Sequence, residues 1–336
     1  MPRHARTSRG SAPMRLAWVM PVVVVVLAGT PDHAQAGGGQ ASNGWAVPRT
    51  PSGQPDLQGV WDFATITPLE RPAQFAGKEV LTAEESAAYE QSRFAIVDHD
   101  TDAGAVLVCA GTGNYNEFWY DRGYGDVVTD RRSSLILDPP DGQIPPLTAE
   151  AQRRPRPAGL SSDSWVDRGL GERCVIGFNA GPPMMPSAYN NNVQLFQAPG
   201  YVVIFNEMVH DARIVPLDGR SHVPNSIRLW SGDSRGHWEG DTLVVETANF
   251  SDRTSVLGST KALRLTERFT RVDADILHYE FTVDDPTTFS SAWTAQVRMV
   301  RSGGPIFEYA CHEGNIGLLG ILAGARFQEA EARRGR

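Results

Sequence analysis

Clusters of lysine and arginine are missing from this sequence. It carries 31 Lys and Arg against 39 Asp and Glu, which gives a formal net charge of -8 at pH 7. Proteins that bind nucleic acid gather cations on one surface to neutralise the phosphates. We therefore expect no nucleic-acid partner.

Long apolar runs are also scarce. Residues 16–29 form one, but it falls short of the roughly 18 residues that a membrane-spanning helix needs. Four arginines precede it and the small-residue triplet Ala34-Gln35-Ala36 follows, which is the build of a secretory signal peptide. We predict cleavage near Ala36, a periplasmic or secreted mature chain with a formal charge near -11, and no membrane span.

Common metal motifs are absent as well. The chain contains no His-Glu-x-x-His, no His-x-His and no Cys-x-x-Cys, and its glycine-rich segment at 231–241 lacks the lysine and the following helix of a phosphate loop. Ser234, in the segment GDSRG, is interpreted as part of a turn. We expect no cofactor. Zinc bound by His210, His222 and His312, with Glu207 or Glu313, is an open alternative.

The second half of the chain alternates strand patterns with turn signals. Segments such as VQLFQ, YVVIFNEM, ARIVPL, SIRLW, TLVVETANF, ILHYEFTV and IFEYACH predict about eight antiparallel strands. Such a meander closes naturally into a barrel that can hold one small ligand. We therefore predict a mainly β fold, a lipocalin-like barrel, with a C-terminal helix at its end.

The first half is irregular by comparison. Proline and glycine are frequent, and TAEES predicts a short helix because Thr82 and Glu85 have the spacing of a capping box. The predicted organisation is a signal peptide at 1–36, an irregular N-terminal wrap with few short helices and strands at 37–185, and the barrel with its C-terminal helix at 186–336.

Side chains alternate between the two faces of a strand, and this alternation singles out two carboxylates. In LRLTERFTR, Glu267 shares the apolar face with Leu265 and Phe269, and Glu207 ends a strand that is apolar on both faces. An unpaired buried carboxylate is costly. Each glutamate is therefore either half of a structural ion pair, for instance with Arg213 or Arg228, or a functional acid or base.

Three cysteines are present, Cys109, Cys174 and Cys311. An exported protein meets an oxidising environment, so two of them are expected to pair. We predict the pair Cys174–Cys311, because the first lies where the barrel begins and the second where it ends.

Several motifs resemble those of a family of exported bacterial proteins of uncharacterised activity. They are GDSRGHWEGDTLVVET, TVDDPTTF, EYACHEGN, LDPPDGQIPPLT and YNNN, and the resemblance covers nearly the whole mature chain. His237 departs from the family pattern, in which arginine is typical. DLQGVW is also similar to the Gly-x-Trp opening of lipocalin-like barrels. Neither resemblance implies an activity.

Two functions are consistent with this sequence. The first is an exported enzyme that performs acid/base chemistry, such as elimination, isomerisation or hydrolysis, on a small and partly apolar molecule. The second is a non-catalytic carrier of a small apolar ligand. The predicted catalytic residues are Glu207, His210, His222, Glu267 and His312. The predicted substrate contacts are Trp230, Trp238, Asn192, Arg213 and Glu308.

Overall fold

The computed structural model describes residues 45–97, 121, 130–154, 161–254 and 256–335. All of them belong to one compact unit, Gly38–Arg336. The predicted signal peptide, its cleavage site and Cys109 lie outside the described residues.

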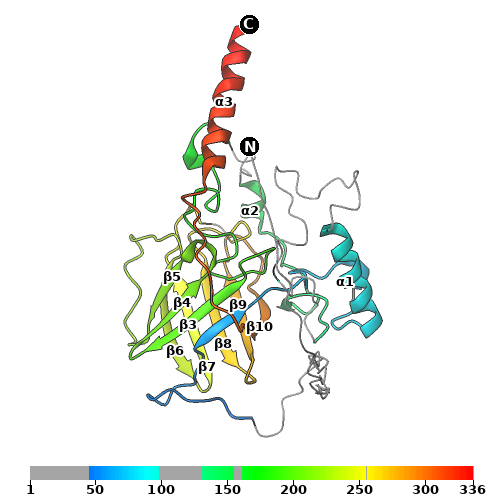
Figure 1. Ribbon diagram of the computed structural model, residues 1–336, viewed down its shortest axis with the longest axis vertical. Helices are drawn as coiled ribbons and strands as arrows, with labels where there is room; N and C mark the ends of the chain where they lie inside the picture. Colours follow the sequence, from blue (N-terminus) through cyan, green and yellow to red (C-terminus); the bar gives the residue numbers. More distant parts are fainter. Residues whose placement is uncertain (1–44, 98–120, 122–129, 155–160, 255, 336) are drawn as a thin grey trace, which may run out of the picture. The chain divides into compact units, whose positions relative to one another are not determined.

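One antiparallel sheet dominates the fold (Figure 1). Its strands follow the order β5-β4-β3-β1-β10-β9-β8-β7-β6, and β2 pairs with β10 beside this path. The terminal strands β5 and β6 contact each other, so the sheet is nearly closed. The strands are β1 (Gly59–Asp62), β2 (Ile136–Asp138), β3 (Asn192–Ala198), β4 (Tyr201–Asn206), β5 (Ala212–Pro216), β6 (Asp233–Glu239), β7 (Thr242–Ala248), β8 (Arg264–Arg271), β9 (Ile276–Asp284) and β10 (Trp293–Arg301).

Two predicted strands differ from the structure. The segment SIRLW forms only an isolated bridge between Leu229 and Phe250, while β6 runs through Ser234, which was expected to lie in a turn. The segment IFEYACH contains no strand. The reason is β1, which pairs with both β3 and β10 and so fills the gap that a last strand would have occupied.

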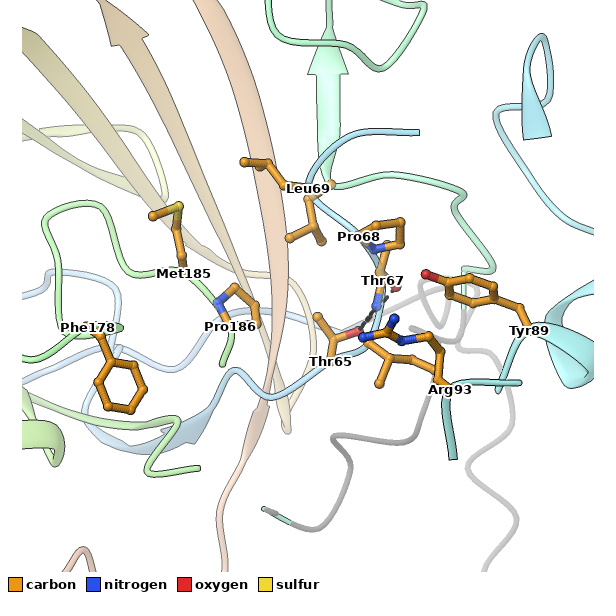
Figure 2. Close-up of a pocket in the computed structure, with 11 residues that line it drawn as sticks. Thr65, Thr67, Pro68, Leu69, Tyr89, Arg93, Phe178, Met185 and Pro186 are labelled. Carbon is orange, nitrogen blue, oxygen red and sulfur yellow. Dashed lines mark hydrogen bonds between the residues drawn. The ribbon is translucent and has the colours of Figure 1, made fainter. Parts of the chain in front are cut away.

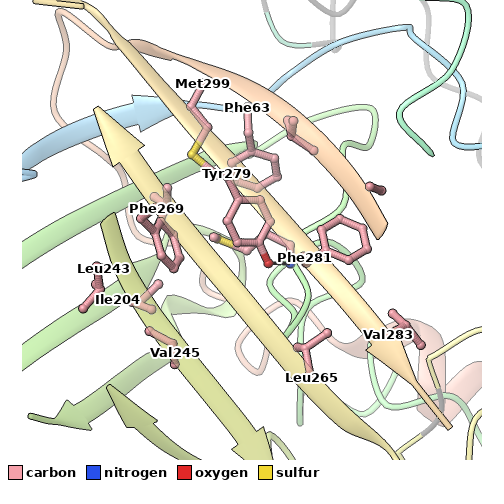
Figure 3. Close-up of a cluster of buried hydrophobic side chains, with 14 of the residues drawn as sticks. Phe63, Ile204, Leu243, Val245, Leu265, Phe269, Tyr279, Phe281, Val283 and Met299 are labelled. Carbon is pink, nitrogen blue, oxygen red and sulfur yellow. Dashed lines mark hydrogen bonds between the residues drawn. The ribbon is translucent and has the colours of Figure 1, made fainter. Parts of the chain in front are cut away.

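The barrel-like sheet encloses a solid apolar core. The prediction that Glu267 shares the buried face with Leu265 and Phe269 is confirmed on β8, and alternate side chains of β9 are buried in the same way. Figure 3 shows Phe269, Tyr279 and Phe281 among aliphatic neighbours from the facing strands. Burial of one large apolar side chain contributes about 1.5–3 kcal/mol, so these rings account for much of the driving force. A small barrel is filled by its own side chains in this way.

Helices of different lengths complete the described part of the chain. They are η1 (Ala73–Phe75), α1 (Ala83–Val97), α2 (Ala149–Arg153), η3 (Trp165–Asp167), η4 (Met208–His210) and α3 (Ile316–Arg334). The capping box of α1 is confirmed, because Thr82 N–H donates to Glu85 Oε2 at 3.0 Å and Glu85 N–H donates to Thr82 Oγ1 at 3.2 Å. The predicted C-terminal helix is α3, capped by the Asn315 side chain.

The predicted disulfide joins Cys174 to Cys311, with the two Cα atoms 5.7 Å apart. It fastens the segment after β10 to the loop that precedes β3. Asn315 Nδ2 strengthens the same junction by donating to the Glu172 carbonyl at 2.7 Å. The bridge therefore anchors the segment that leads into α3.

Candidate functional site

Glu267 lies at the centre of the core and is fully buried. Arg213, which projects inward from β5, holds it with two hydrogen bonds of 2.6 and 2.8 Å. The Tyr279 hydroxyl donates to Glu267 Oε1 at 2.7 Å and accepts the Met184 N–H at 3.0 Å. The carboxylate is thus paired, and through Tyr279 it anchors the backbone N–H of Met184.

Electrostatic interactions keep the Arg213–Glu267 pair ionic. Burial lowers the pKa of Arg213, but the adjacent Glu267 carboxylate outweighs burial and holds that pKa above its ordinary value. Burial, reinforced by the same carboxylate, raises the pKa of the Tyr279 hydroxyl well above its usual value. A guanidinium cation and a protonated phenol therefore both donate to one carboxylate, which is the arrangement that a buried charge needs.

Glu207 is buried too, at the end of β4. It accepts a hydrogen bond from Asn192 Nδ2 at 2.8 Å and another from the Phe307 N–H at 2.8 Å. Asn191, which precedes Asn192, donates hydrogen bonds to the Asp121 carboxylate from its backbone N–H and from its side-chain amide. The asparagines of the YNNN motif therefore hold two carboxylates in place.

Asp62 completes this carboxylate cluster, which comprises Asp62, Asp121 and Glu207. Burial raises the pKa of Asp62 to about 6, with the negative charges of Asp121 and Glu207 adding to the increase and a hydrogen bond from the Ala64 N–H opposing it. No sequence pattern marks Asp62 or Asp121. Asp62 comes near Glu207 because β1 pairs with β3, and Asp121 is brought there by its hydrogen bonds to Asn191.

His222 forms the second polar group of interest. Its Nδ1 lies 2.9 Å from Asp233 Oδ2, and the imidazole is partly exposed. Asp233 is itself fixed by Arg235, at 2.7 Å, and by the Val223 N–H, at 3.0 Å. A carboxylate that orients a partly exposed imidazole in this way is a common feature of general bases.

The Ser234 hydroxyl does not face the His222 imidazole. The segment GDSRG has the Gly-x-Ser-x-Gly spacing of a nucleophile elbow, which requires a sharp turn from strand to helix. Here β6 runs through Asp233 to Glu239 without such a turn, so the predicted turn is wrong. Ser234 Oγ instead lies 2.9 Å from Thr247 Oγ1 on β7. Neighbouring residues of a strand face opposite sides, which separates Ser234 from Asp233.

The remaining predicted residues are dispersed. His210, Glu308 and His312 are exposed, and Trp230 is half-buried. Trp230 precedes β6 and Trp238 lies near its last residue, so the two indoles occupy opposite ends of that strand. The sequence-predicted residues therefore divide between the core, the carboxylate cluster, the His222–Asp233 pair and the surface.

A cavity lies on the outer side of the structure, and we call it the wall cavity (Figure 2). Its volume is about 350 Å³, within the usual range for small-molecule sites. Figure 2 shows Tyr89 and Arg93 of α1 next to the segment 65–69, with Phe178, Met185 and Pro186 across from α1. The lining residues are Thr65, Ile66, Thr67, Pro68, Leu69, Tyr89, Arg93, Leu135, Phe178, Met185 and Pro186.

Each wall of this cavity is held by a specific interaction. Tyr89 and Arg93 are four residues apart and so lie on one face of α1, and Tyr89 packs edge-on against Phe75. The Leu135 N–H donates to the Pro68 carbonyl at 2.8 Å, which ties the segment 65–69 to the residues before β2. Met185 and Pro186 follow Met184, whose N–H is bound by Tyr279. The walls of the cavity are therefore held by contacts within the fold.

Three further cavities are lined by described residues. One, of about 450 Å³, includes Trp238 and Tyr201, and a smaller one, of about 180 Å³, shares Phe178 with the wall cavity. The third, of about 600 Å³, carries Arg71 together with Glu79 and Asp141. Glu267, His222 and Glu207 line none of these four cavities.

The described residues contain no group of three or more His, Cys, Asp or Glu placed to hold a metal ion. Within the same part of the chain, no helix is long and apolar enough to cross a membrane. Comparison with protein-family models, with curated proteins and with solved structures gives no match. The fold alone therefore defines the class, a mainly β protein with a nearly closed antiparallel barrel-like sheet.

Arg93 and Tyr89 were missed by the sequence analysis. Their helix was identified, but α1 has a weakly apolar face, so nothing marked the side that meets the rest of the fold. The available signal was the spacing of Ser86, Tyr89 and Arg93, which places all three on one face.

Proposed function

We propose that this protein binds a small, largely apolar molecule in the wall cavity and serves as a carrier. The observation that supports this function most directly is the composition of the wall. Eight of its eleven residues are aliphatic, proline or aromatic, and its few polar groups lie at one side. Apolar walls with a few placed polar groups are typical of ligand sites.

The filled core is the reason for placing the ligand outside the barrel. Its interior is occupied by Trp61, Phe269 and Tyr279, and its central carboxylate is already paired with Arg213. A ligand of about ten non-hydrogen atoms, at roughly 0.5 kcal/mol for each atom, would bind with a Kd on the order of 0.1–1 mM.

Titration calorimetry with the neutral probe 3-phenylpropan-1-ol tests this proposal. The probe should bind the wild-type protein, and Phe178→Ala, which removes a half-exposed ring from the cavity wall, should weaken binding about fivefold or more. Phe307→Ala is the matched control, because Phe307 is exposed and lines none of the four cavities. Equal binding by the wild-type protein and Phe178→Ala would refute the site.

Catalysis by acid/base chemistry is the second candidate, and one observation favours it. The imidazole of His222 is oriented by Asp233 at 2.9 Å and remains partly exposed. If His222 is a general base, the wild-type protein should hydrolyse p-nitrophenyl acetate, and His222→Gln should lower the rate about 100-fold or more. His237→Gln, at an exposed histidine, is the control. A wild-type rate no higher than that of His222→Gln rejects catalysis at this pair.

A further inference from the structure

Arg93 is the only charged residue among the eleven that line the wall cavity. It belongs to α1, four residues after Tyr89, and extends beside Thr65 in Figure 2. The cavity of about 600 Å³ differs, because there Arg71 shares the lining with Glu79 and Asp141. A cation without a carboxylate on the same wall gives the wall cavity a positive end.

The Nε of Arg93 is buried, and it has no hydrogen-bond acceptor among the residues that the structure describes. No described carboxylate forms an ion pair with this arginine either. A buried donor left without a partner costs about 1–3 kcal/mol, so such a group is expected to meet an acceptor that the fold does not supply. A ligand in the cavity would supply one.

Resting on the proposed binding function, we propose that the ligand of the wall cavity carries a carboxylate, which Arg93 binds, on an apolar or aromatic body. The guanidinium fork matches a carboxylate, because Nε–H and one Nη–H point in parallel toward its two oxygens. A dianion such as a phosphate monoester fits less well, since one arginine would face two charges. The apolar body lies against Phe178, Met185 and Pro186, away from the cation.

Because the whole chain is negatively charged, selectivity for an anionic ligand depends on Arg93. The formal net charge is -8, so an anionic ligand approaches a protein that repels it at long range. Selectivity for a carboxylate must then come from a local contact. A charge-assisted hydrogen bond gives about a 10- to 100-fold preference.

A matched pair of probes tests the inference, 3-phenylpropionate and 3-phenylpropan-1-ol, which share one body and differ in the carboxylate. Calorimetry at low salt should show that the wild-type protein prefers the carboxylate by about tenfold or more. Arg93→Gln should bring the ratio of the two affinities to about one, whereas Arg93→Lys should retain part of the preference for the carboxylate. Arg153→Gln, at an exposed helical arginine, should behave as the wild-type protein does.

The possible results separate the two proposals. If the alcohol binds and the carboxylate binds no more tightly, the inference about Arg93 is wrong and the binding function stands. If neither probe binds the wild-type protein, the binding function itself is rejected. A carboxylate preference that survives in Arg93→Gln would assign the anion to another cation and overturn the inference. Circular dichroism of each variant establishes that it is folded.

Discussion

Glu267 shows most clearly what a single residue does in this fold. Replacing it in Glu267→Gln leaves the Arg213 guanidinium buried without a countercharge, and we expect a loss of about 3–5 kcal/mol in the free energy of unfolding. Denaturant titration measures this as a lower midpoint with an unchanged slope. Glu280→Gln, on the outer face of β9, is the control. Unchanged stability together with lost ligand binding would instead support a functional role for Glu267.

Asp62 makes the stability of the fold depend on pH. Its pKa is raised from 3.8 to about 6 in the folded protein, so the folded state binds the proton more tightly than the unfolded state does. The stabilising effect of that proton is complete below pH 4 and is lost as the pH rises through 6.

Asp62→Asn keeps the side chain neutral at every pH. We therefore expect this variant to be more stable than the wild-type protein at pH 7 and to differ little from it at pH 4. Urea denaturation at several pH values measures the difference. Asp252→Asn, at an exposed position, should show no such pH dependence. A constant difference between Asp62→Asn and the wild-type protein would contradict the assignment.

The seam between β5 and β6 depends on a glycine. A Cβ at Gly236 would come within 2.6 Å of Leu217 Cδ2 and 2.9 Å of Val215 Cγ1, so a side chain there pushes the two strands apart. We expect Gly236→Ala to cost about 1–3 kcal/mol through overpacking. Gly303→Ala, where a Cβ meets nothing within 4 Å, should be nearly neutral. Thermal unfolding of the two variants gives the comparison.

The disulfide stabilises the fold through the length of the loop that it closes. Cys174 and Cys311 are 137 residues apart, and a loop of this length corresponds to about 5 kcal/mol in the chain-entropy model. The double variant Cys174→Ser and Cys311→Ser should therefore unfold at a much lower denaturant concentration. Adding a reductant should destabilise the wild-type protein and leave the double variant unchanged. Peptide mapping that recovers both thiols free would refute the bridge.

Export concerns the whole molecule. If residues 1–36 are a signal peptide, intact-mass spectrometry of the periplasmic or secreted protein should give an N-terminus near Gly37. A substitution of Ala36 by a bulky residue should slow processing, because the cleavage site requires a small side chain there. Recovery of the unprocessed chain from the cytoplasm alone would contradict export.

The sequence by itself determined most strands of the second half of the chain and their buried faces. Alternation in β8 and β9 specified Leu265, Glu267, Tyr279 and Phe281 as inward, because side chains of a strand alternate with a period of two whatever the strand pairs with. The α1 capping box is a local signal of the same kind. The pairing of Cys174 with Cys311 was also predictable, since the order of the strands already placed them at the two ends of the barrel.

Only the tertiary structure decided what closes the sheet and where a ligand can bind. The pairing of β1 with β3 and β10 joins segments far apart in the chain, and it excluded the predicted last strand. The partner of Glu267 and the positions of Asp62 and Arg93 likewise depend on contacts between distant segments. Periodicity specifies the face of the strand on which a residue lies. Which residue of a distant segment it contacts is set by tertiary packing, which no local pattern encodes.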